Sequence, residues 1–235
     1  MNLGFLGTGH ITAAMVTGLG LSEHRIWVSP RNAETAADLA RRFSSVTVAA
    51  SNQDVIDRSD VVVLALPPRT APEILAGLTF RADTQVISVI SGLSIARIPS
   101  AQVTRAVPVP SVADRAGPTV IYPPNRIAAD VFDSLGTTIQ VDSEEEFEAF
   151  CAVTATIASQ LAFLDSIASW LMRHGAPEND ARDYIRAMMS GAINGDAGAE
   201  AHATPGGINE RLLQHLRRHN VFERVTEGLD LVLNR

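Results

Sequence analysis

The chain opens with an apolar strand that runs into a glycine turn and then into a helical segment. Residues 3–12 read LGFLGTGHIT, which follows the G-x-G-x-x-G/A pattern with Thr12 at its third position. Gly7 allows the tight turn, and Gly9 lets the backbone approach a pyrophosphate at the helix N-terminus. A second apolar strand follows at residues 25–28. Because this context is what makes the motif specific, the segment predicts a dinucleotide-binding βαβ unit.

The residues after the second strand bear on the choice of dinucleotide. NAD-binding units usually carry an acid there to bind the ribose 2′-OH, whereas this chain has Ser29-Pro30-Arg31-Asn32. Arg31 can fork onto a 2′-phosphate, and Ser29 and Asn32 can donate to it. Such a charge-assisted contact contributes about 1.5–3 kcal/mol. Arg31 as a solvated loop residue and Asn32 as a helix cap fit the same pattern, and both roles are compatible with the predicted cofactor, NADP (NADPH).

Strand-like and helix-like segments alternate as far as about residue 142. Residues 60–66 are almost wholly apolar, which suits a parallel strand covered on both faces. This alternation predicts an α/β fold with a Rossmann-type doubly wound parallel sheet. The apolar runs lie at 3–6, 25–28, 46–48, 60–66, 85–90, 102–107, 118–122 and 137–141.

Helical patterns replace the strands after about residue 142, over 144–173, over 178–196 and in the remaining segment. We therefore expect two domains, an NADP-binding domain over 1–142 and an all-helical substrate and dimerisation domain over 143–235. A helix over 144–173 would be ~45 Å long. Because so small a domain cannot cover such a helix, we expect a homodimer or a larger homo-oligomer.

The composition excludes several classes of partner. The 235 residues are 46% hydrophobic and 19% charged, as in ordinary soluble globular proteins. The net charge of −7 argues against nucleic acid. Cys151 is the only cysteine, so the sequence predicts no disulfide framework and no cysteine-type zinc site. No continuous apolar run approaches the ~18–20 residues of a membrane span and no leader-like segment is visible, so we expect a cytoplasmic protein without a membrane partner.

A second glycine turn, Thr204-Pro205-Gly206-Gly207, precedes a helical pattern near the end of the chain. Thr204 is a good N-cap, Pro205 suits the first turn, and the glycines expose backbone N–H groups at the positive helix end. The turn can therefore receive an anion the size of a carboxylate or a phosphate. An ordinary capped helix produces the same pattern.

Taken together, the two turns and the helical second domain resemble the pyrroline-5-carboxylate reductase family over most of the chain. Residues 7–12 and 29–32 resemble its nucleotide loop and its 2′-phosphate segment. Residues 86–94 and 104–108 are similar to its strand ending in Ala/Ser-Gly and to its Arg-x-Met-Pro segment near the nicotinamide. Residues 203–209 resemble its Ser-Pro-Gly-Gly-Thr-Thr substrate loop. The resemblance implies an NADPH-dependent reductase of a small carboxylated cyclic imine, as in proline biosynthesis.

The resemblance also assigns site residues. Thr204, Gly206 and Gly207 would grip the substrate carboxylate. Asn209 stands where the family's last threonine lies near the imine nitrogen, so Thr204 and Asn209 are the candidate catalytic residues. The implied cofactor contacts are Gly7, Thr8, Gly9, His10, Ile11, Ser29, Arg31, Asn32, Ala65, Leu66, Pro67, Ser91, Gly92 and Pro108.

The substrate half departs from the family pattern. Pro67-Pro68 stands for its Lys-Pro and Ile208-Asn209 for its Thr-Thr. Three alternatives therefore stay open: a reductase of another imine or keto acid, a deazaflavin-linked oxidoreductase, and a non-catalytic NADP-sensing protein. Asp165 and His202 are weaker candidates for substrate contacts. His215 and His219 stand one helical turn apart but lack a further metal ligand at suitable spacing, so we expect no metal site.

Overall fold

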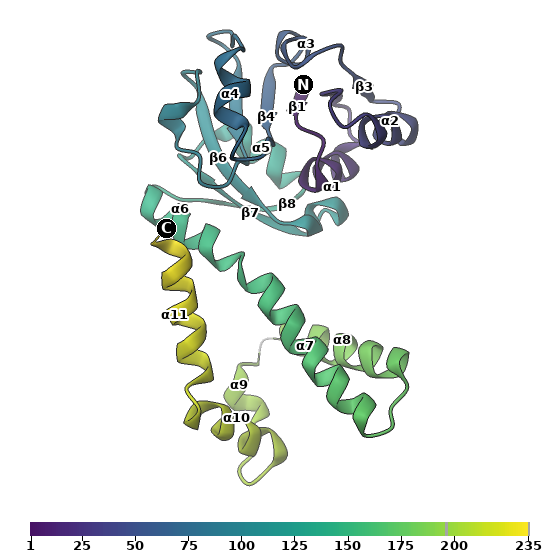
Figure 1. Cartoon of the computed structure of the whole chain (residues 1–235), viewed down its shortest axis with the longest axis vertical. Coiled ribbons are helices and arrows are strands. Elements are labelled where there is room, and N and C mark those ends of the chain that lie inside the picture. Colours follow the sequence, from purple (N-terminus) through teal and green to yellow (C-terminus); the bar gives the residue numbers. More distant parts are fainter. Residues whose placement is uncertain (196, 235) are drawn as a thin grey trace. The chain divides into compact units, whose positions relative to one another are not determined.

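The computed structural model describes residues 1–195 and 197–234, and it divides the chain into two compact units, Met1–Cys151 and Ala152–Arg235. The first unit extends past residue 142, where the domain boundary was expected, and each unit is described here by itself (Figure 1). Residue 196 of the predicted 178–196 helix and residue 235 of the predicted second domain lie outside the described residues.

Within the described residues, the first unit is built on one eight-stranded sheet with the order β3-β2-β1-β4-β5-β6-β7-β8. The predicted doubly wound sheet is confirmed with one correction: β7 pairs antiparallel with β6, whereas the other neighbours pair in parallel. Only a short 3₁₀ turn, η2 (Pro110–Asp114), lies between these two strands, and a parallel pair needs a crossover of a dozen or more residues. The strands are β1 (Asn2–Leu6), β2 (Arg25–Val28), β3 (Val46–Val48), β4 (Val61–Leu64), β5 (Gln85–Ser88), β6 (Val103–Pro108), β7 (Gly117–Tyr122) and β8 (Gly136–Gln140).

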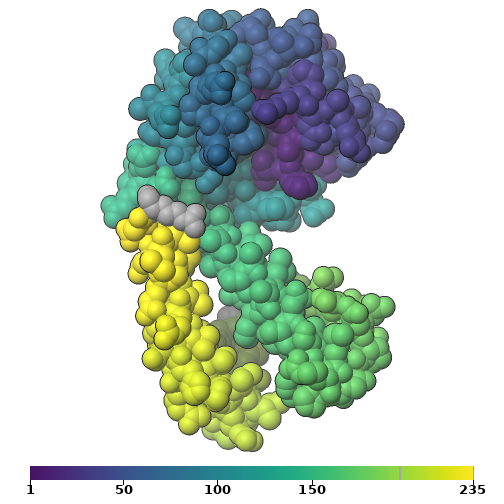
Figure 2. Space-filling view, in the orientation of Figure 1, coloured from purple at the N-terminus to yellow at the C-terminus, as the bar shows by residue number. Residues whose placement is uncertain are grey.

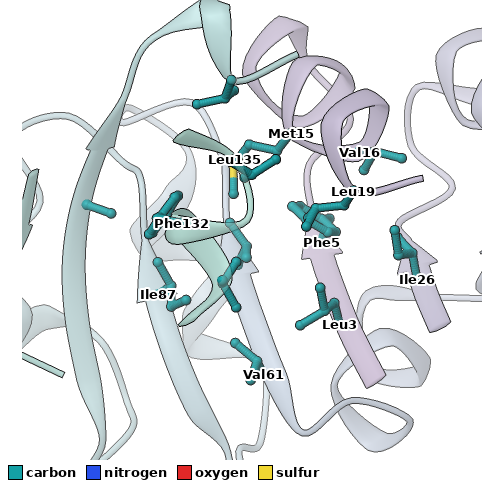
Figure 3. Close-up of a cluster of buried hydrophobic side chains, with 14 of the residues drawn as sticks. Leu3, Phe5, Met15, Val16, Leu19, Ile26, Val61, Ile87, Phe132 and Leu135 are labelled. Atoms are coloured by element: carbon teal, nitrogen blue, oxygen red, sulfur yellow. The ribbon is translucent and has the colours of Figure 1, made fainter. Parts of the chain in front are cut away.

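Helices cover both faces of this sheet, and alternate residues of β4 show how the core divides. Val61 and Val63 belong to one buried cluster, which includes Phe5 and Met15, and its side chains are drawn in Figure 3. Val62, with Leu64, belongs to a second cluster on the opposite face. A strand that is apolar at every position is thereby buried on both sides. The helices of this part are α1 (His10–Leu19), α2 (Ala33–Arg42), α3 (Asn52–Asp57), α4 (Ala71–Ala76), α5 (Arg126–Asp133) and the 3₁₀ turn η1 (Ile95–Arg97).

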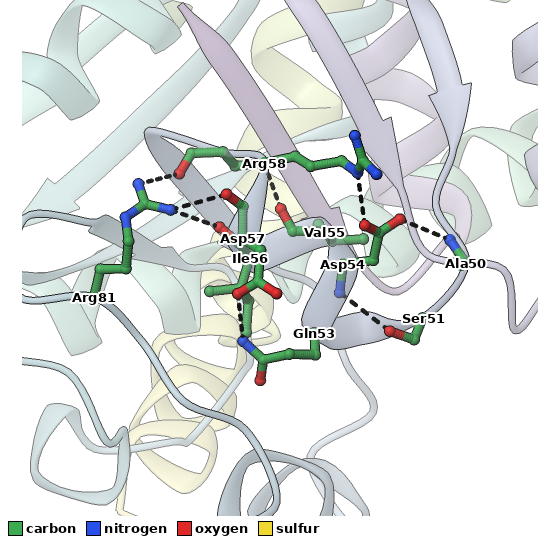
Figure 4. Close-up of polar contacts among 10 residues, drawn as sticks. Ala50, Ser51, Gln53, Asp54, Val55, Ile56, Asp57, Arg58 and Arg81 are labelled. Carbon is green, nitrogen blue, oxygen red and sulfur yellow. Dashed lines mark hydrogen bonds and ion pairs between the residues drawn. The ribbon is translucent and has the colours of Figure 1, made fainter.

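Side chains close both ends of the short helix α3. The hydroxyl of Ser51 accepts from the N–H of Asp54 at 3.1 Å, which is an N-cap. At the other end, Arg81 donates to the carbonyls of Ile56 and Ser59 at 3.2 and 3.0 Å (Figure 4). These bonds satisfy carbonyls that a helix end leaves free, and they fix the chain where it enters β4.

The predicted helix over 144–173 is two helices, α6 (Glu144–Val153) and α7 (Thr156–Arg173). The first packs on the sheet, because Phe147 is buried against Val120 and Val141. Beneath it, the guanidinium of Arg105 on β6 lies 4.6 Å from the centre of the Phe147 ring. This docking explains why the first compact unit includes most of α6.

The second unit is helical, as predicted. Helices α7 and α8 (Glu178–Asn194) pack against each other (Figure 2), and Arg182 pairs with Asp165 at 2.5 Å. Many large apolar side chains of α7 are exposed in the single chain. These exposed residues are Ile157, Leu161, Phe163, Trp170 and Met172. The other helices are α9 (Ala199–His202), α10 (Ile208–Arg218) and α11 (Val221–Leu233).

By length and composition alone, residues 144–173 would suffice to cross a membrane, with a mean hydropathy of 1.5 in the best window and 11% of that window buried. This differs from the expectation that no segment approaches a span. The expectation considered continuous apolar runs, whereas a window average tolerates single charged residues such as Glu148. Such a match is weak evidence, since the core helices of soluble proteins also give it.

Candidate functional site

The first glycine turn lies where β1 ends and α1 begins. Gly7 has φ +99°, and a Cβ there would lie 2.3 Å from the carbonyl oxygen of Ala65, so only glycine fits. Gly9 is the N-cap of α1, and a Cβ there would meet no atom of the chain within 4 Å. The hydroxyl of Thr12 donates to the Gly7 carbonyl at 2.8 Å. The turn is therefore rigid, and the space beside Gly9 lies at a helix N-terminus that favours an anion.

A cleft of about 430 Å³ opens beside this turn. We call it the nucleotide cleft. The hydroxyl oxygen of Thr8 is buried and has no hydrogen-bond partner in the part of the chain that the structure describes, which is unusual for a buried polar group and suits a ligand oxygen. The residues that line the cleft, all among the predicted cofactor contacts, are Gly7, Thr8, Gly9, Arg31, Asn32, Ala65, Leu66 and Pro67.

The three polar residues after β2 take different roles. Ser29 is 1% exposed, and its hydroxyl accepts from the Gly7 N–H at 2.9 Å. The Asn32 amide donates to the Thr8 carbonyl at 3.1 Å and its oxygen caps α2. Arg31 is exposed and makes no ion pair with any residue the structure describes. Ser29 and Asn32 thus support the turn, and Arg31 is the group available to a 2′-phosphate.

The remaining predicted cofactor contacts do not line the nucleotide cleft. His10 is exposed at the start of α1, and Ile11 packs against the core. Ser91 and Gly92 are exposed beyond β5, and Pro108 ends β6. The strands β1, β4, β5 and β6 run in parallel. Ser91, Gly92 and Pro108 therefore lie at the carboxyl ends of the strands, as Gly7 does. Doubly wound sheets bind their ligands at these carboxyl ends.

The second glycine turn leads into α10 in the second unit. Gly206 has φ +75°, and the Gly207 N–H donates to the Thr204 carbonyl at 2.8 Å. The N–H of Gly206 donates to a carboxylate oxygen of Glu210 at 2.6 Å. The amide of Asn209 donates to the His202 carbonyl at 3.0 Å. The backbone N–H groups of Gly206 and Gly207 and the Asn209 amide are therefore bonded within the chain in this structure.

Comparisons with known proteins bear on the nucleotide cleft and on the chain as a whole. A family model described as "NADP oxidoreductase coenzyme F420-dependent" matches residues 2–92, which include the nucleotide cleft. Pyrroline-5-carboxylate reductase 2 of Bos taurus is 26% identical, covering 90% of this chain and 72% of its own. The Pasteurella multocida pyrroline-5-carboxylate reductase is 24% identical, over 80% of this chain and 76% of its own.

Solved structures place the fold in the same group. The enzyme of Streptococcus pyogenes superposes with a TM-score of 0.85 at 24% identity, covering 100% of this chain and 97% of its own. The chain is similar in sequence and in fold to pyrroline-5-carboxylate reductases. The Plasmodium falciparum pyrroline carboxylate reductase, solved with NADP bound, has a TM-score of 0.84 at 16% identity and covers 100% of this chain and 96% of its own.

Two features of the chain were missed in the sequence. Arg105 lies in the Arg-x-x-Pro segment, yet it is 3% exposed and pairs with Glu148 at 2.6 Å and Glu144 at 3.0 Å. The signal in the sequence that could have revealed this pairing was the spacing of Glu144 and Glu148, two acids one helical turn apart. Glu210 was also overlooked, although it stands three residues after the N-cap Gly207, where a capping box carries Glu or Gln.

The other candidates make contacts within the chain. Asp165 is bound to Arg182. Burial, with a smaller effect of Glu148, raises the pKa of the Cys151 thiol to about 11, so it stays protonated at neutral pH. The rings of His215 and His219 lie 4.4 Å apart, and no group of three metal-binding side chains occurs within the described residues.

Proposed function

We propose that this chain is an NADPH-dependent reductase that acts on a small cyclic imine bearing a carboxylate, the class of substrate that its relatives are named for. The observation that carries the proposal is the nucleotide cleft, with an open space beside Gly9, an orphaned Thr8 hydroxyl and an exposed Arg31. These features fit a dinucleotide phosphate.

The residues of the first unit would bind and orient the cofactor, which supplies a hydride when it is bound. The turn from Gly7 to Gly9 and the first N–H groups of α1 would receive the pyrophosphate. Arg31 would pair with the 2′-phosphate. Ser29 and Asn32 would act indirectly, by holding the turn in the conformation that receives the pyrophosphate.

The second unit would supply the substrate contacts. We propose that Thr204, Gly206 and Gly207 receive the carboxylate and that Asn209 donates to the imine nitrogen, for which its amide would have to leave the His202 carbonyl. A protonated imine is already electrophilic, so the reaction demands little acid–base chemistry. Holding the C=N bond in place would be the main contribution of these residues.

We further propose a homodimer that works in the cytoplasm. The exposed apolar residues of α7 support the dimer, since a two-fold interface would bury them. A single cysteine and a net charge of −7 are compatible with a reducing aqueous compartment.

The test is steady-state reduction with the purified full chain. We expect NADPH consumption with pyrroline-5-carboxylate, matched by formation of proline. Absence of turnover with cyclic imines would contradict the proposal. Turnover with a reduced deazaflavin would then favour an F420-linked oxidoreductase, as the family model suggests. NADPH binding without any turnover would favour an NADP-sensing protein.

A further inference from the structure

The turn before α10 already holds a carboxylate that belongs to the chain itself. The Gly206 N–H donates to Glu210 Oε2 at 2.6 Å, and the Gly207 N–H donates to the Thr204 carbonyl at 2.8 Å. Both N–H groups that the proposed function assigns to the substrate carboxylate are thus engaged. A substrate carboxylate has to displace at least the Glu210 side chain to reach them.

The Glu210 contact is favourable for two physical reasons. Glu210 is the third residue of α10, which follows the N-cap Gly207, and an acid in a first turn is stabilised by the helix dipole. The distance of 2.6 Å is as short as that of a charge-assisted hydrogen bond. Glu210 is half-buried, although its bond to the turn is open to solvent.

Resting on the proposed function, we propose that Glu210 is a specificity-determining residue, which competes with the substrate carboxylate for the Gly206 N–H. A second carboxylate at this turn would stand beside the charge of Glu210, and like charges sharing one site repel. An imine without a carboxylate does not meet this competition. Glu210 therefore weakens the binding of carboxylated imines and so reduces the preference of the enzyme for them over uncarboxylated imines.

Two substitutions separate the charge of Glu210 from its role as a cap. Glu210→Gln removes the charge and keeps an acceptor for the Gly206 N–H, as capping boxes allow. Glu210→Ala removes both. With saturating NADPH, we expect Glu210→Gln to lower the KM for pyrroline-5-carboxylate about tenfold, and Glu210→Ala to lower it at least as much. The KM for 1-pyrroline, which lacks the carboxylate, stays within about threefold.

The matched control is Glu223→Gln, which removes a charge from the first turn of α11. It should leave both KM values unchanged. A Glu210→Gln enzyme whose KM values for both imines are unchanged, or rise together, would reduce Glu210 to a helix cap and overturn the inference.

A binding measurement tests the role of Glu210 separately from the proposed catalytic activity. Calorimetric titration of the NADP-loaded protein with proline and with pyrrolidine requires no turnover. Glu210→Gln should bind proline about tenfold more tightly and pyrrolidine unchanged. If neither imine is reduced but this gain appears, the proposed function fails and the role of Glu210 stands. If imines are reduced but the affinity for proline does not change, the role of Glu210 fails and the function stands.

Discussion

The hydroxyl of Ser29 accepts a hydrogen bond from the backbone N–H of Gly7 at 2.9 Å, although these residues follow different strands. NAD-binding units usually have an acid in this region for the ribose 2′-OH. Here the side chain is buried and holds the glycine turn instead. We therefore expect the choice of cofactor to depend on Arg31 and the geometry of the turn to depend on Ser29.

Substitution of Arg31 tests whether this residue alone determines the choice between NADPH and NADH. Arg31→Ala should weaken NADPH binding about ten- to a hundred-fold, because a charge-assisted contact to the 2′-phosphate is lost. NADH binding should hardly change. Fluorescence titration of both cofactors measures the effect, with Arg41→Ala on α2 as the control, since Arg41 pairs with Asp38. Equal affinity of the unmodified protein for NADH and NADPH would contradict the assignment.

Substitution of Ser29 should have a different signature. Ser29→Ala leaves the Gly7 N–H without its acceptor, which costs about 1–3 kcal/mol for a buried donor, and should weaken NADPH and NADH alike. Denaturant unfolding and the same titrations measure both effects. Ser22→Ala, which removes a hydroxyl bonded to the Leu19 carbonyl, should leave cofactor binding intact. A loss confined to NADPH would show that Ser29 contacts the 2′-phosphate.

Gly9 offers a test of the pyrophosphate position. An alanine methyl there meets no atom of the chain, so Gly9→Ala should fold with an unchanged melting temperature. The same methyl would occupy the space proposed for the pyrophosphate, and both cofactors should bind roughly tenfold more weakly or worse, equivalent to about 1.4 kcal/mol. Gly191→Ala, where the added methyl also meets nothing, is the control. Unchanged binding in Gly9→Ala would place the pyrophosphate elsewhere.

The buried Arg105 predicts a stability effect. The double change Glu144→Gln and Glu148→Gln removes both carboxylates that pair with it and leaves a buried cation uncompensated. We expect the free energy of unfolding to fall by about 2–4 kcal/mol. The control is the double change Glu145→Gln and Glu146→Gln, which removes the same number of charges from exposed positions on α6 and should have little effect on stability. If both double variants lost the same free energy of unfolding, the effect would come from the total negative charge of α6 and not from its pairing with Arg105.

The exposed face of α7 predicts assembly. We expect light scattering to give a dimer or a larger oligomer at micromolar concentration, and Leu161→Asp to shift it toward the monomer. Leu21→Asp, at an exposed leucine of the first unit, should leave the assembly unchanged. A monomeric unmodified protein, or one that floats with lipid vesicles, would contradict the proposed interface.

Most of the sheet could be predicted because its apolar runs are short and separated by clear helical patterns. The direction of β7 could not be read from its apolar residues, since parallel and antiparallel strands share the same period; only the short connection from Pro108 carried that information. The break at residues 154–155 was hidden for a similar reason. The apolar pattern continues across it in the sequence, whereas in the structure α6 ends at Val153 and Phe147 packs on the sheet.

The candidate site was predictable where backbone conformation dictates the residue. Gly7 and Gly9 are specified by a positive φ and by open space, so the sequence reveals the turn. Side chains that bond to each other across the fold are harder to foresee. The sequence suggested Ser29 as a phosphate donor but did not reveal that its hydroxyl also accepts from the Gly7 N–H. The partnership of Glu210 with Gly206 depends on a rotamer that spacing alone does not determine.

The position of β1 between β2 and β4 has a consequence for biosynthesis. Its residues pair with Arg25–Val28 on one side and with Val61–Leu64 on the other. During translation β1 therefore leaves the ribosome well before its second neighbour exists, and Leu3 and Phe5 stay uncovered on that side until residue 64 has emerged. Because uncovered strand edges promote misassembly, the nascent chain is open to wrong strand pairing at β1 during this interval.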